Sequence, residues 1–255
     1  MPSEHTMKTV MLRTLSALAV AASLLAPARA VDLTAYTVDW APYNYSEQGA
    51  IKGFSTDMLR AMCQSAKIDC DIRMVPWARA YKTVQTTPNT LVFTTARKPS
   101  RENEFLWVGP IVPRSTWVYG RAGQEKSVRT LQDLAQLRIG VVRGEAAQQD
   151  LLDAGVPASS LVEETTNAEV VRLLVGARVD AMVETELGMA WHLRSASIAP
   201  ATVTKLVKLS DGGAYYYALN LQTDPALVKK LQDALDRLRR TGKLQPIIAK
   251  YTAAK

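Results

Sequence analysis

The sequence predicts an α/β protein with two lobes, two hinge crossings of the chain between them and a central cleft. Strands alternate with helices in two successive parts of the chain, which is typical of sheets covered by helices. Extended runs at 113–120 and 214–221 can carry the chain to a second lobe and back. We expect the first lobe to comprise 31–116 with 217–255, and the second 117–216.

The first 30 residues predict a cleaved export signal. Lys8 and Arg13 precede the apolar run 15–26, and small residues lead to a cleavage point after Ala30. The apolar run is too short to favour a membrane span. Its removal from the 255 residues leaves 225, enough for two modest lobes. Whether translation starts at Met1 or Met7 is left open.

The net charge of +7 falls to +5 without the signal, and the surplus is spread along the chain. The densest basic group, Arg237 with Arg239 and Arg240, shares an amphipathic helix with Asp233 and Asp236. This mixture is typical of a solvated helix face, so no nucleic-acid partner is expected.

Two cysteines occur, Cys63 and Cys70, and both follow the signal. An even count in an exported chain predicts a disulfide, which would stabilise the protein by about 2 kcal/mol. The alternatives are two buried thiols or a metal site. Metal is disfavoured because the two histidines, His5 and His192, lie far away in the sequence, and no cofactor is expected.

The first lobe is predicted to alternate strands and helices. Apolar spacing and turn residues give strand 31–38, a turn-rich segment 44–53, a helix capped by Ser55 or Thr56, strand 68–75, a short helix 76–84 and strand 91–95. This order implies a parallel sheet.

The second lobe repeats the pattern, and two helices form the tail. The predicted elements are a short helix capped by Thr130, strand 138–142, helix 145–154, strand 161–163, a helix capped by Asn167, strands 179–183 and 205–209, a helix from Asp224 and Pro225 to Gly242, and helix 244–251.

Aromatic and hydroxyl side chains follow successive strands of the first lobe. Trp40 and Trp77 come after the first two strands, and Thr94 and Thr95 end the third. Ligands of parallel sheets collect at the carboxyl ends of the strands, so these side chains could line a pocket. The alternative is that the tryptophans are core residues.

A basic loop follows the third strand and holds Arg97, Lys98 and Arg101. A guanidinium beside small hydroxyls can bind a carboxylate. The alternative is a solvated turn, because Lys-Pro-Ser-Arg-Glu-Asn is rich in residues that are common in turns whatever their function.

The second lobe offers weaker signals. Gly144 between a strand and a helix can let backbone N–H groups face an anion, although Glu145 would repel one. Glu184, Thr185 and Glu186 follow a buried strand. These acids could equally be charges that favour a helix N-terminus.

The chain resembles the family 3 extracellular solute-binding proteins, the polar amino acid type that serves ABC importers. The resemblance covers nearly all of the chain after residue 30. It rests on Trp40-Ala41-Pro42-Tyr43, on Gly53-Phe54 with Asp57, on Arg101 with Trp107 and Pro110, on Arg178-Val179-Asp180-Ala181 and on Thr241-Gly242-Lys243. Cys63 and Cys70 match a disulfide found in some members.

The resemblance implies a role for each matching residue. Arg101 would pair with a ligand carboxylate, and Gly144, Glu145 and Ala146 would stand where the second lobe offers backbone N–H groups. Trp40, Tyr43 and Trp77 would line the pocket, with Thr94 and Thr95 donating hydrogen bonds.

Two positions depart from the family pattern. Thr185 stands where amino-acid binders usually place an aspartate for the α-ammonium, with Glu184 and Glu186 beside it, and Glu145 stands where a hydroxyl residue is common. Arg79 and Arg97 add positive charge that would suit a ligand with more than one acidic group, or one of them is a surface residue.

The resemblance implies a monomeric periplasmic binding protein for a small polar ligand with a carboxylate, delivered to an inner-membrane ABC permease. The alternative is an exported prephenate or arogenate dehydratase with Glu184 or Glu145 as general acid. A receptor sensor module is disfavoured by the predicted cleavage and by the lack of a later apolar segment long enough to span a membrane.

Overall fold

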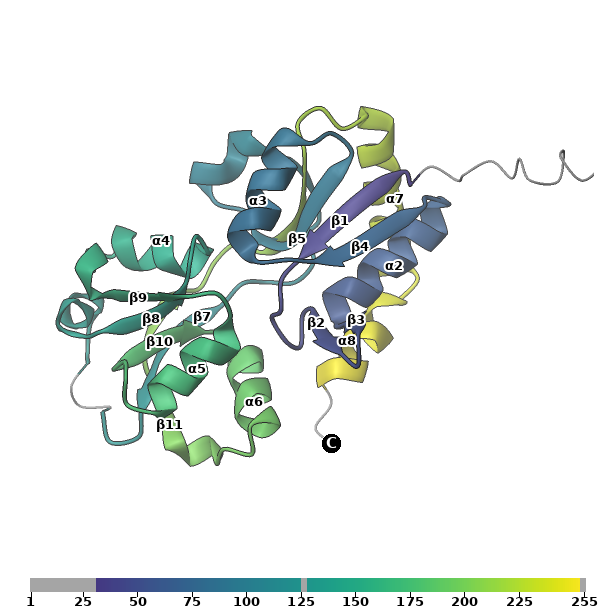
Figure 1. The fold of residues 1–255 in the computed structure, drawn as a ribbon. Helices are drawn as coiled ribbons and strands as arrows, with labels where there is room; N and C mark the ends of the chain where they lie inside the picture. The colour runs from purple at the N-terminus through teal and green to yellow at the C-terminus, as the bar shows by residue number, and fades with distance from the viewer. Residues whose placement is uncertain (1–30, 125–127, 253–255) are drawn as a thin grey trace, which may run out of the picture. The chain divides into compact units, whose positions relative to one another are not determined.

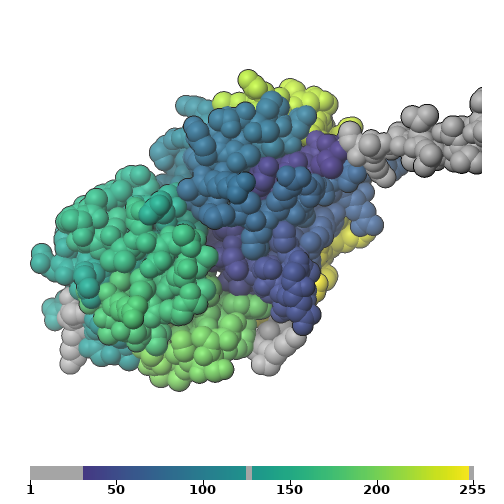
Figure 2. Space-filling model, in the orientation of Figure 1, coloured from purple at the N-terminus to yellow at the C-terminus, as the bar shows by residue number. Residues whose placement is uncertain are grey.

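The computed structural model describes residues 31–124 and 128–252, so the predicted signal lies outside the described residues. Within this range the chain forms two five-stranded sheets and a two-stranded hairpin. Figure 1 shows that each large sheet is packed with its own helices, which confirms the predicted two-lobed α/β fold. In Figure 2 the first lobe joins the purple and blue start of the chain to its yellow end.

The first sheet has the order β4-β1-β5-β12-β6. Its strands are β1 (Leu33–Thr37), β4 (Cys70–Met74), β5 (Thr90–Ala96), β6 (Leu106–Val108) and β12 (Tyr215–Leu219). β1 runs parallel to β4 and β5, as predicted, whereas β12 is antiparallel to both β5 and β6. The carboxyl ends of β1, β4 and β5 therefore share one edge.

Four helices cover this sheet: α2 (Phe54–Ala66), α3 (Trp77–Thr86), α7 (Pro225–Arg240) and α8 (Leu244–Thr252). α2 contacts both α7 and α8, and α3 packs on β5. Their apolar faces bury Met58, Val84 and Leu231 in one core with Phe93 and Tyr217 of the sheet. The C-terminal helices thus belong to the first lobe, because their apolar stripes complete its core.

The second sheet has the order β11-β7-β10-β8-β9. Its strands are β7 (Thr116–Arg121), β8 (Ile139–Val142), β9 (Leu161–Glu164), β10 (Ala181–Glu184) and β11 (Val203–Ser210). The helices are α4 (Ala146–Asp153), α5 (Asn167–Val175) and α6 (Glu186–Ser195). Two separate apolar clusters, one with Leu134 and Leu151 and one with Leu174 and Leu193, show that both faces of the sheet are covered.

The chain crosses between the sheets twice, after β6 and after β11. The crossings touch each other, because Pro113 pairs with Ala214 and the Arg114 N–H donates to the Gly213 carbonyl at 3.2 Å. Tyr215 and Tyr216 already belong to β12 of the first sheet. The exact lobe limits, predicted at 116/117 and 216/217, stay a prediction.

Most predicted elements are confirmed, and the differences are local. The turn-rich segment 44–53 contains the hairpin β2 (Tyr45–Glu47) and β3 (Ala50–Lys52). α2 begins after Gly53, not at Ser55 or Thr56. A Cβ at Gly53 would lie 2.2 Å from the Tyr43 carbonyl oxygen, and its φ of 120° favours glycine, so close backbone approach fixes this start.

The predicted caps have mixed outcomes. Thr130 and Asp224 cap their helices as expected. The cap of α5 is Thr166 rather than Asn167, because Thr166 and Glu169 form a reciprocal capping box. The Asn167 side chain is therefore not used to cap α5.

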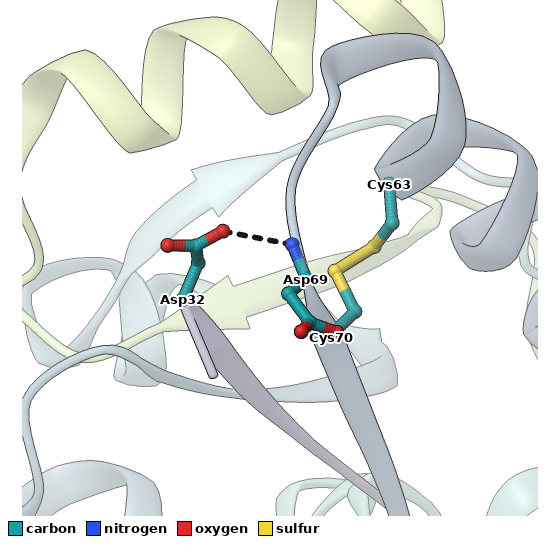
Figure 3. Close-up of a disulfide and its surroundings, with 4 residues drawn as sticks. All are labelled: Asp32, Cys63, Asp69 and Cys70. Carbon is teal, nitrogen blue, oxygen red and sulfur yellow. Dashed lines mark hydrogen bonds between the residues drawn. A yellow bond between two sulfur atoms is a disulfide. The ribbon is translucent and has the colours of Figure 1, made fainter. Parts of the chain in front are cut away.

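The predicted disulfide is confirmed: Cys63 and Cys70 are bonded, with Cα atoms 6.2 Å apart. Figure 3 shows that the bond joins the end of α2 to the start of β4. Beside it, the Asp69 N–H donates to the Asp32 carboxylate at 2.8 Å. Together these links tie a helix to the strands next to it.

Candidate ligand-binding site

Residues from both lobes surround a cavity of about 40 Å³. The carboxyl ends of β1, β5 and β10, the start of α4 and the first crossing all contribute to its wall. The lining residues are Val38, Trp40, Trp77, Thr94, Ala96, Arg101, Arg114, Thr116, Glu145, Ala146, Ala147, Asn167, Val183, Glu184 and Tyr215.

Arg101 is the buried cation contributed by the first lobe. It lies in the 3-10 turn Pro99–Glu104 after β5, with 8% of its surface exposed. Its guanidinium lies over the rings of Trp77 and Tyr81, at 5.6 and 5.2 Å. Nη2 donates to the Gly144 carbonyl at 3.1 Å, whereas Nη1 has no hydrogen-bond partner among the described residues. Burial lowers the pKa of Arg101 from its ordinary value.

The Gly144 carbonyl accepts from two residues of the first lobe. Besides Arg101, Trp77 at the start of α3 donates its Nε1–H to this oxygen at 2.8 Å. The Gly144 N–H donates to Gln148 and the Glu145 N–H to the Val142 carbonyl. These two amides are therefore engaged within the second lobe in this arrangement, and the contact of the 144–146 amides with a ligand anion stays a prediction.

Glu184 is the buried carboxylate at the end of β10, only 3% exposed. Trp40 donates its Nε1–H to both carboxylate oxygens at 3.1 Å, and the Thr185 N–H donates at 2.6 Å. His192 Nε2 lies 3.6 Å from the same carboxylate. Gly188 leaves room for this carboxylate, since a Cβ there would lie 2.5 Å from Oε1 and the carboxylate would have to shift.

Thr185 is the N-cap of α6 and also contacts the first lobe. Its hydroxyl accepts from the Gly188 N–H at 3.0 Å and from the Tyr43 hydroxyl at 3.2 Å. Tyr43 stacks on Trp40 with ring centroids 4.2 Å apart. The α6 N-terminus is thus held against an aromatic pair.

Glu145 occupies the N-cap position of α4 without a side-chain capping hydrogen bond, and it lines the same cavity as Arg101. Burial raises the pKa of Glu145 to about 8, the charge of Glu184 adds to this, and Arg101 and a hydrogen bond from Asn167 oppose it. The Glu145 carboxyl is therefore largely protonated at neutral pH.

Arg114 and Thr116, in and just after the first crossing, also line the cavity. Arg114 is 6% exposed, donates from Nη1 to Ser210 Oγ at 2.7 Å and pairs through Nη2 with Asp150. Within the part of the chain that the structure describes, Arg114 Nε and Thr116 Oγ1 have no hydrogen-bond partner. Three buried donors of the lining residues thus lack a partner among the described residues: Arg101 Nη1, Arg114 Nε and Thr116 Oγ1.

The sequence matches the model of the bacterial extracellular solute-binding proteins, family 3, over residues 33–254. The chain belongs to this family. The resemblance predicted from the motifs is therefore confirmed over nearly the whole of the described chain.

Two curated relatives of this solute-binding protein are binding proteins by name. One is a probable histidine-binding protein of Neisseria gonorrhoeae, 24% identical over 226 residues, covering 86% of this chain and 82% of the relative. The other is the amino-acid-binding protein AabA of Dichelobacter nodosus, 23% identical over 256 residues, covering 96% and 97%.

Solved structures share the fold. An ancestral arginine-binding protein bound to arginine has a TM-score of 0.75 at 18% identity, covering 87% of this chain and 98% of its own. An ancestral amino acid-binding protein, described as a precursor of cyclohexadienyl dehydratase, has a TM-score of 0.72 at 17% identity, covering 86% and 94%. At these identities the likeness establishes the fold alone.

Seven of the eleven predicted site residues line the cavity: Trp40, Trp77, Thr94, Arg101, Glu145, Ala146 and Glu184. Tyr43, Gly144 and Thr185 do not line it but make the contacts between the lobes described above. Thr95 does neither, because its hydroxyl donates to the Val92 carbonyl of its own strand. Thr94 donates to Asn44 Oδ1 at 2.6 Å, so its hydroxyl proton is already used.

The additional charges expected near the site lie elsewhere. Arg97 is exposed, pairs with Glu102 and stacks on Trp107, and Arg79 is exposed on α3. Glu186 pairs with Lys205 at the surface. Neither arginine lines the cavity, and of the two flanking glutamates only Glu184 does.

Eight lining residues were not predicted from the sequence, and the polar ones among them are Arg114, Thr116, Asn167 and Tyr215. The run Arg114-Ser115-Thr116 was a usable signal, because a cation and hydroxyls in a crossing must lie near the cleft. Asn167 was expected to cap a helix, so it was not predicted to line the cavity.

Within residues 31–124 and 128–252, no three His, Cys, Asp or Glu side chains gather in a way that could hold a metal ion. Among the same residues, no helix is long and apolar enough to cross a membrane.

Proposed function

We propose that this protein captures a small amino acid or related carboxylate between its lobes and delivers it to an ABC importer. The observation that carries the proposal is Arg101, a guanidinium that is 8% exposed and whose Nη1 has no partner among the described residues. A carboxylate is the guest that satisfies such a donor, through a charge-assisted hydrogen bond.

Glu184 supports recognition of an amino group on the same ligand. Its carboxylate lines the cavity and is held by Trp40 and by the Thr185 N–H. It stands one residue before Thr185, which occupies the family's usual position for the aspartate that binds the ammonium. A ligand that carries both a carboxylate and an ammonium is complementary to Arg101 and Glu184 together.

The relatives support the same ligand class. Both curated relatives are named for binding amino acids, one of them for histidine. We propose amino acids as the ligand class of this chain, but not histidine in particular. Identities of 23% and 24% leave the side-chain pocket free to differ.

Ligand capture requires the lobes to open and close. A ligand held by Arg101 of the first lobe and Glu184 of the second makes both sets of contacts only in the closed form, so binding favours closure. The predicted signal 1–30 supports a periplasmic location, in which the protein would meet its permease at the inner membrane. A monomeric state is part of the same proposal.

The proposal is tested by a thermal-shift screen of amino acids and small organic acids, followed by calorimetry. Arg101→Ala should weaken carboxylate binding by about 2 to 4 kcal/mol, roughly 30- to 1,000-fold. Arg97→Ala is the matched control, because Arg97 is an exposed arginine near the same turn that pairs with Glu102. Equal affinities for the wild type and Arg101→Ala would refute the proposal.

A second candidate function is supported by Glu145. A carboxyl whose pKa is raised to about 8 in a cavity with a buried arginine has the properties of a general acid. This favours the dehydratase alternative, in which prephenate loses water and carbon dioxide. Absorbance of phenylpyruvate distinguishes the two functions: turnover that Glu145→Gln abolishes would establish an enzyme, and its absence with tight binding of an amino acid supports a carrier.

A further inference from the structure

We propose that Arg114 and Thr116 form a second anion subsite in the same cavity, and that the ligand is a compact acidic amino acid with two carboxylates and one ammonium. The inference rests on the proposed function and deepens it. Arg101 then binds one carboxylate, Arg114 Nε and Thr116 Oγ1 bind the other, and Glu184 binds the ammonium.

The first argument comes from the buried donors. Arg101, Arg114 and Thr116 are 8%, 6% and 4% exposed, and one donor of each lacks a hydrogen-bond partner in the described part of the chain. Buried polar groups in folded proteins are almost always paired, and these three residues line one cavity, so a guest rich in acceptors would satisfy their free donors. One carboxylate satisfies Arg101, and the remaining two donors call for a second acceptor group.

The second argument is that Arg114 is held in place. Nη1 and Nη2 are engaged by Ser210 at the end of β11 and Asp150 on α4, so the guanidinium is fixed and Nε is the donor left over. Asp150 does not cancel the charge of Arg114 alone, because Lys98 also donates to Asp150 at 2.7 Å. Arg114 therefore keeps positive character toward the cavity.

The third argument is the charge balance of the lining residues. Their ionisable members are Arg101, Arg114, Glu145 and Glu184. Burial holds the pKa of Glu145 near 8, so this carboxyl is largely neutral at pH 7 and the wall carries one positive charge in excess. Two carboxylates and one ammonium supply the complementary single negative charge, which a neutral or basic amino acid cannot do.

The fourth argument is size. The cavity of about 40 Å³ has room for roughly three water molecules. Every amino acid is larger than three water molecules and requires the lobes to open, but a compact one requires less opening than an extended basic side chain. The second acidic group that Arg79 and Arg97 were expected to bind is thus assigned to Arg114 instead.

Calorimetry on the processed protein tests the inference with matched pairs of ligands. L-aspartate and L-glutamate should each bind at least tenfold more tightly than their isosteric amides, L-asparagine and L-glutamine. They should also exceed L-arginine and L-histidine. Amides or basic amino acids that bind as tightly as the acids, or more tightly, would overturn the assignment.

Two variants locate the subsite. Thr116→Val removes a hydroxyl that has no protein partner in the described chain, so thermal stability should not fall, while affinity for the acid should drop roughly tenfold. Arg114→Gln should lower acid affinity by a larger factor than amide affinity, because only the acids carry the second carboxylate. Ser210→Ala is the control, because it removes a contact of Arg114 without removing the charge or Nε.

The outcomes separate this inference from the proposed function. Binding of neutral or basic amino acids that depends on Arg101 but not on Arg114 or Thr116 would refute the second subsite and leave the proposed function intact. Failure of every amino acid and carboxylic acid to bind would refute both.

Discussion

At the scale of single residues, Glu145 controls how the charge of the cavity depends on pH. Its carboxyl is protonated below its pKa of about 8, because burial disfavours the charged form and Glu184 adds to the penalty. Above that pH it becomes an anion beside Arg101. The cavity then loses its positive excess.

Affinity for an anionic ligand should therefore fall as pH rises through 8. With a pKa of about 8, the dissociation constant of L-aspartate should rise by up to about fourfold between pH 6.5 and 8.5, by proton linkage. Glu145→Gln cannot ionise and should show a flat profile in calorimetry. A rise of the same size in Glu145→Gln would assign the pH dependence to another group.

The same carboxyl affects stability. Its pKa in the folded protein exceeds the ordinary value of 4.5, so its favourable contribution is complete below pH 4.5 and is lost as pH rises through 8. At pH 8.5 Glu145→Gln should melt higher than the wild type by several degrees, because a pKa raised from 4.5 to about 8 corresponds to an upper bound of about 5 kcal/mol. The difference should vanish near pH 4.5 in thermal unfolding without ligand, and a gap of equal size at both pH values would contradict this origin.

At the scale of elements, helices and strands with strong local patterns could be predicted from sequence. Pro225 after Asp224 marks the start of α7, and alternating apolar residues mark β4. Local patterns fail where distant segments decide the outcome. Gly53 starts α2 because the Tyr43 backbone lies against it, and β6 exists because β12 returns from the second lobe to pair with it.

The candidate site could be predicted in part for the same reason. Trp40, Trp77 and Arg101 follow strands whose carboxyl ends meet at one edge, so the rule for parallel sheets placed them together. The partner of a donor cannot be derived from sequence. The Gly144 carbonyl, and not its N–H, faces the first lobe. This orientation depends on a φ of 73° at Gly144 and on Gln148, whose Oε1 accepts from the Gly144 N–H.

The disulfide is an element-scale constraint that should affect stability but not binding. Cys63 and Cys70 are seven residues apart, which corresponds to about 2 kcal/mol in the chain-entropy model. Replacing both with serine should lower the melting temperature by roughly 4 to 8 °C. Ligand affinity should stay unchanged, because neither cysteine lines the cavity.

The control for that experiment is a reductant. Dithiothreitol should destabilise the wild type toward the level of the double serine variant and leave the variant itself unaffected. A loss of ligand affinity in the variant would show that α2 and β4 transmit strain to the site.

At the scale of the whole described molecule, ion pairs as well as the site link the two lobes. Lys98, in the loop after β5, donates to Asp150 on α4 at 2.7 Å, with both side chains 13% exposed. Arg114 of the crossing pairs with the same carboxylate. Asp150 therefore accepts from both Lys98 and Arg114 when the lobes are in contact, as they are in this structure.

Asp150→Asn should shift the equilibrium toward an open form. The substitution removes the negative charge between Lys98 and Arg114, so closure would bring two cations together without compensation. Small-angle X-ray scattering without ligand should give a larger radius of gyration than for the wild type, and saturating ligand should restore the wild-type value. Asp233→Asn is the matched control, because its pair with Lys229 lies within α7 and joins no lobes. An Asp150→Asn protein as compact as the wild type without ligand would mean that the aromatic and Gly144 contacts alone hold the lobes together.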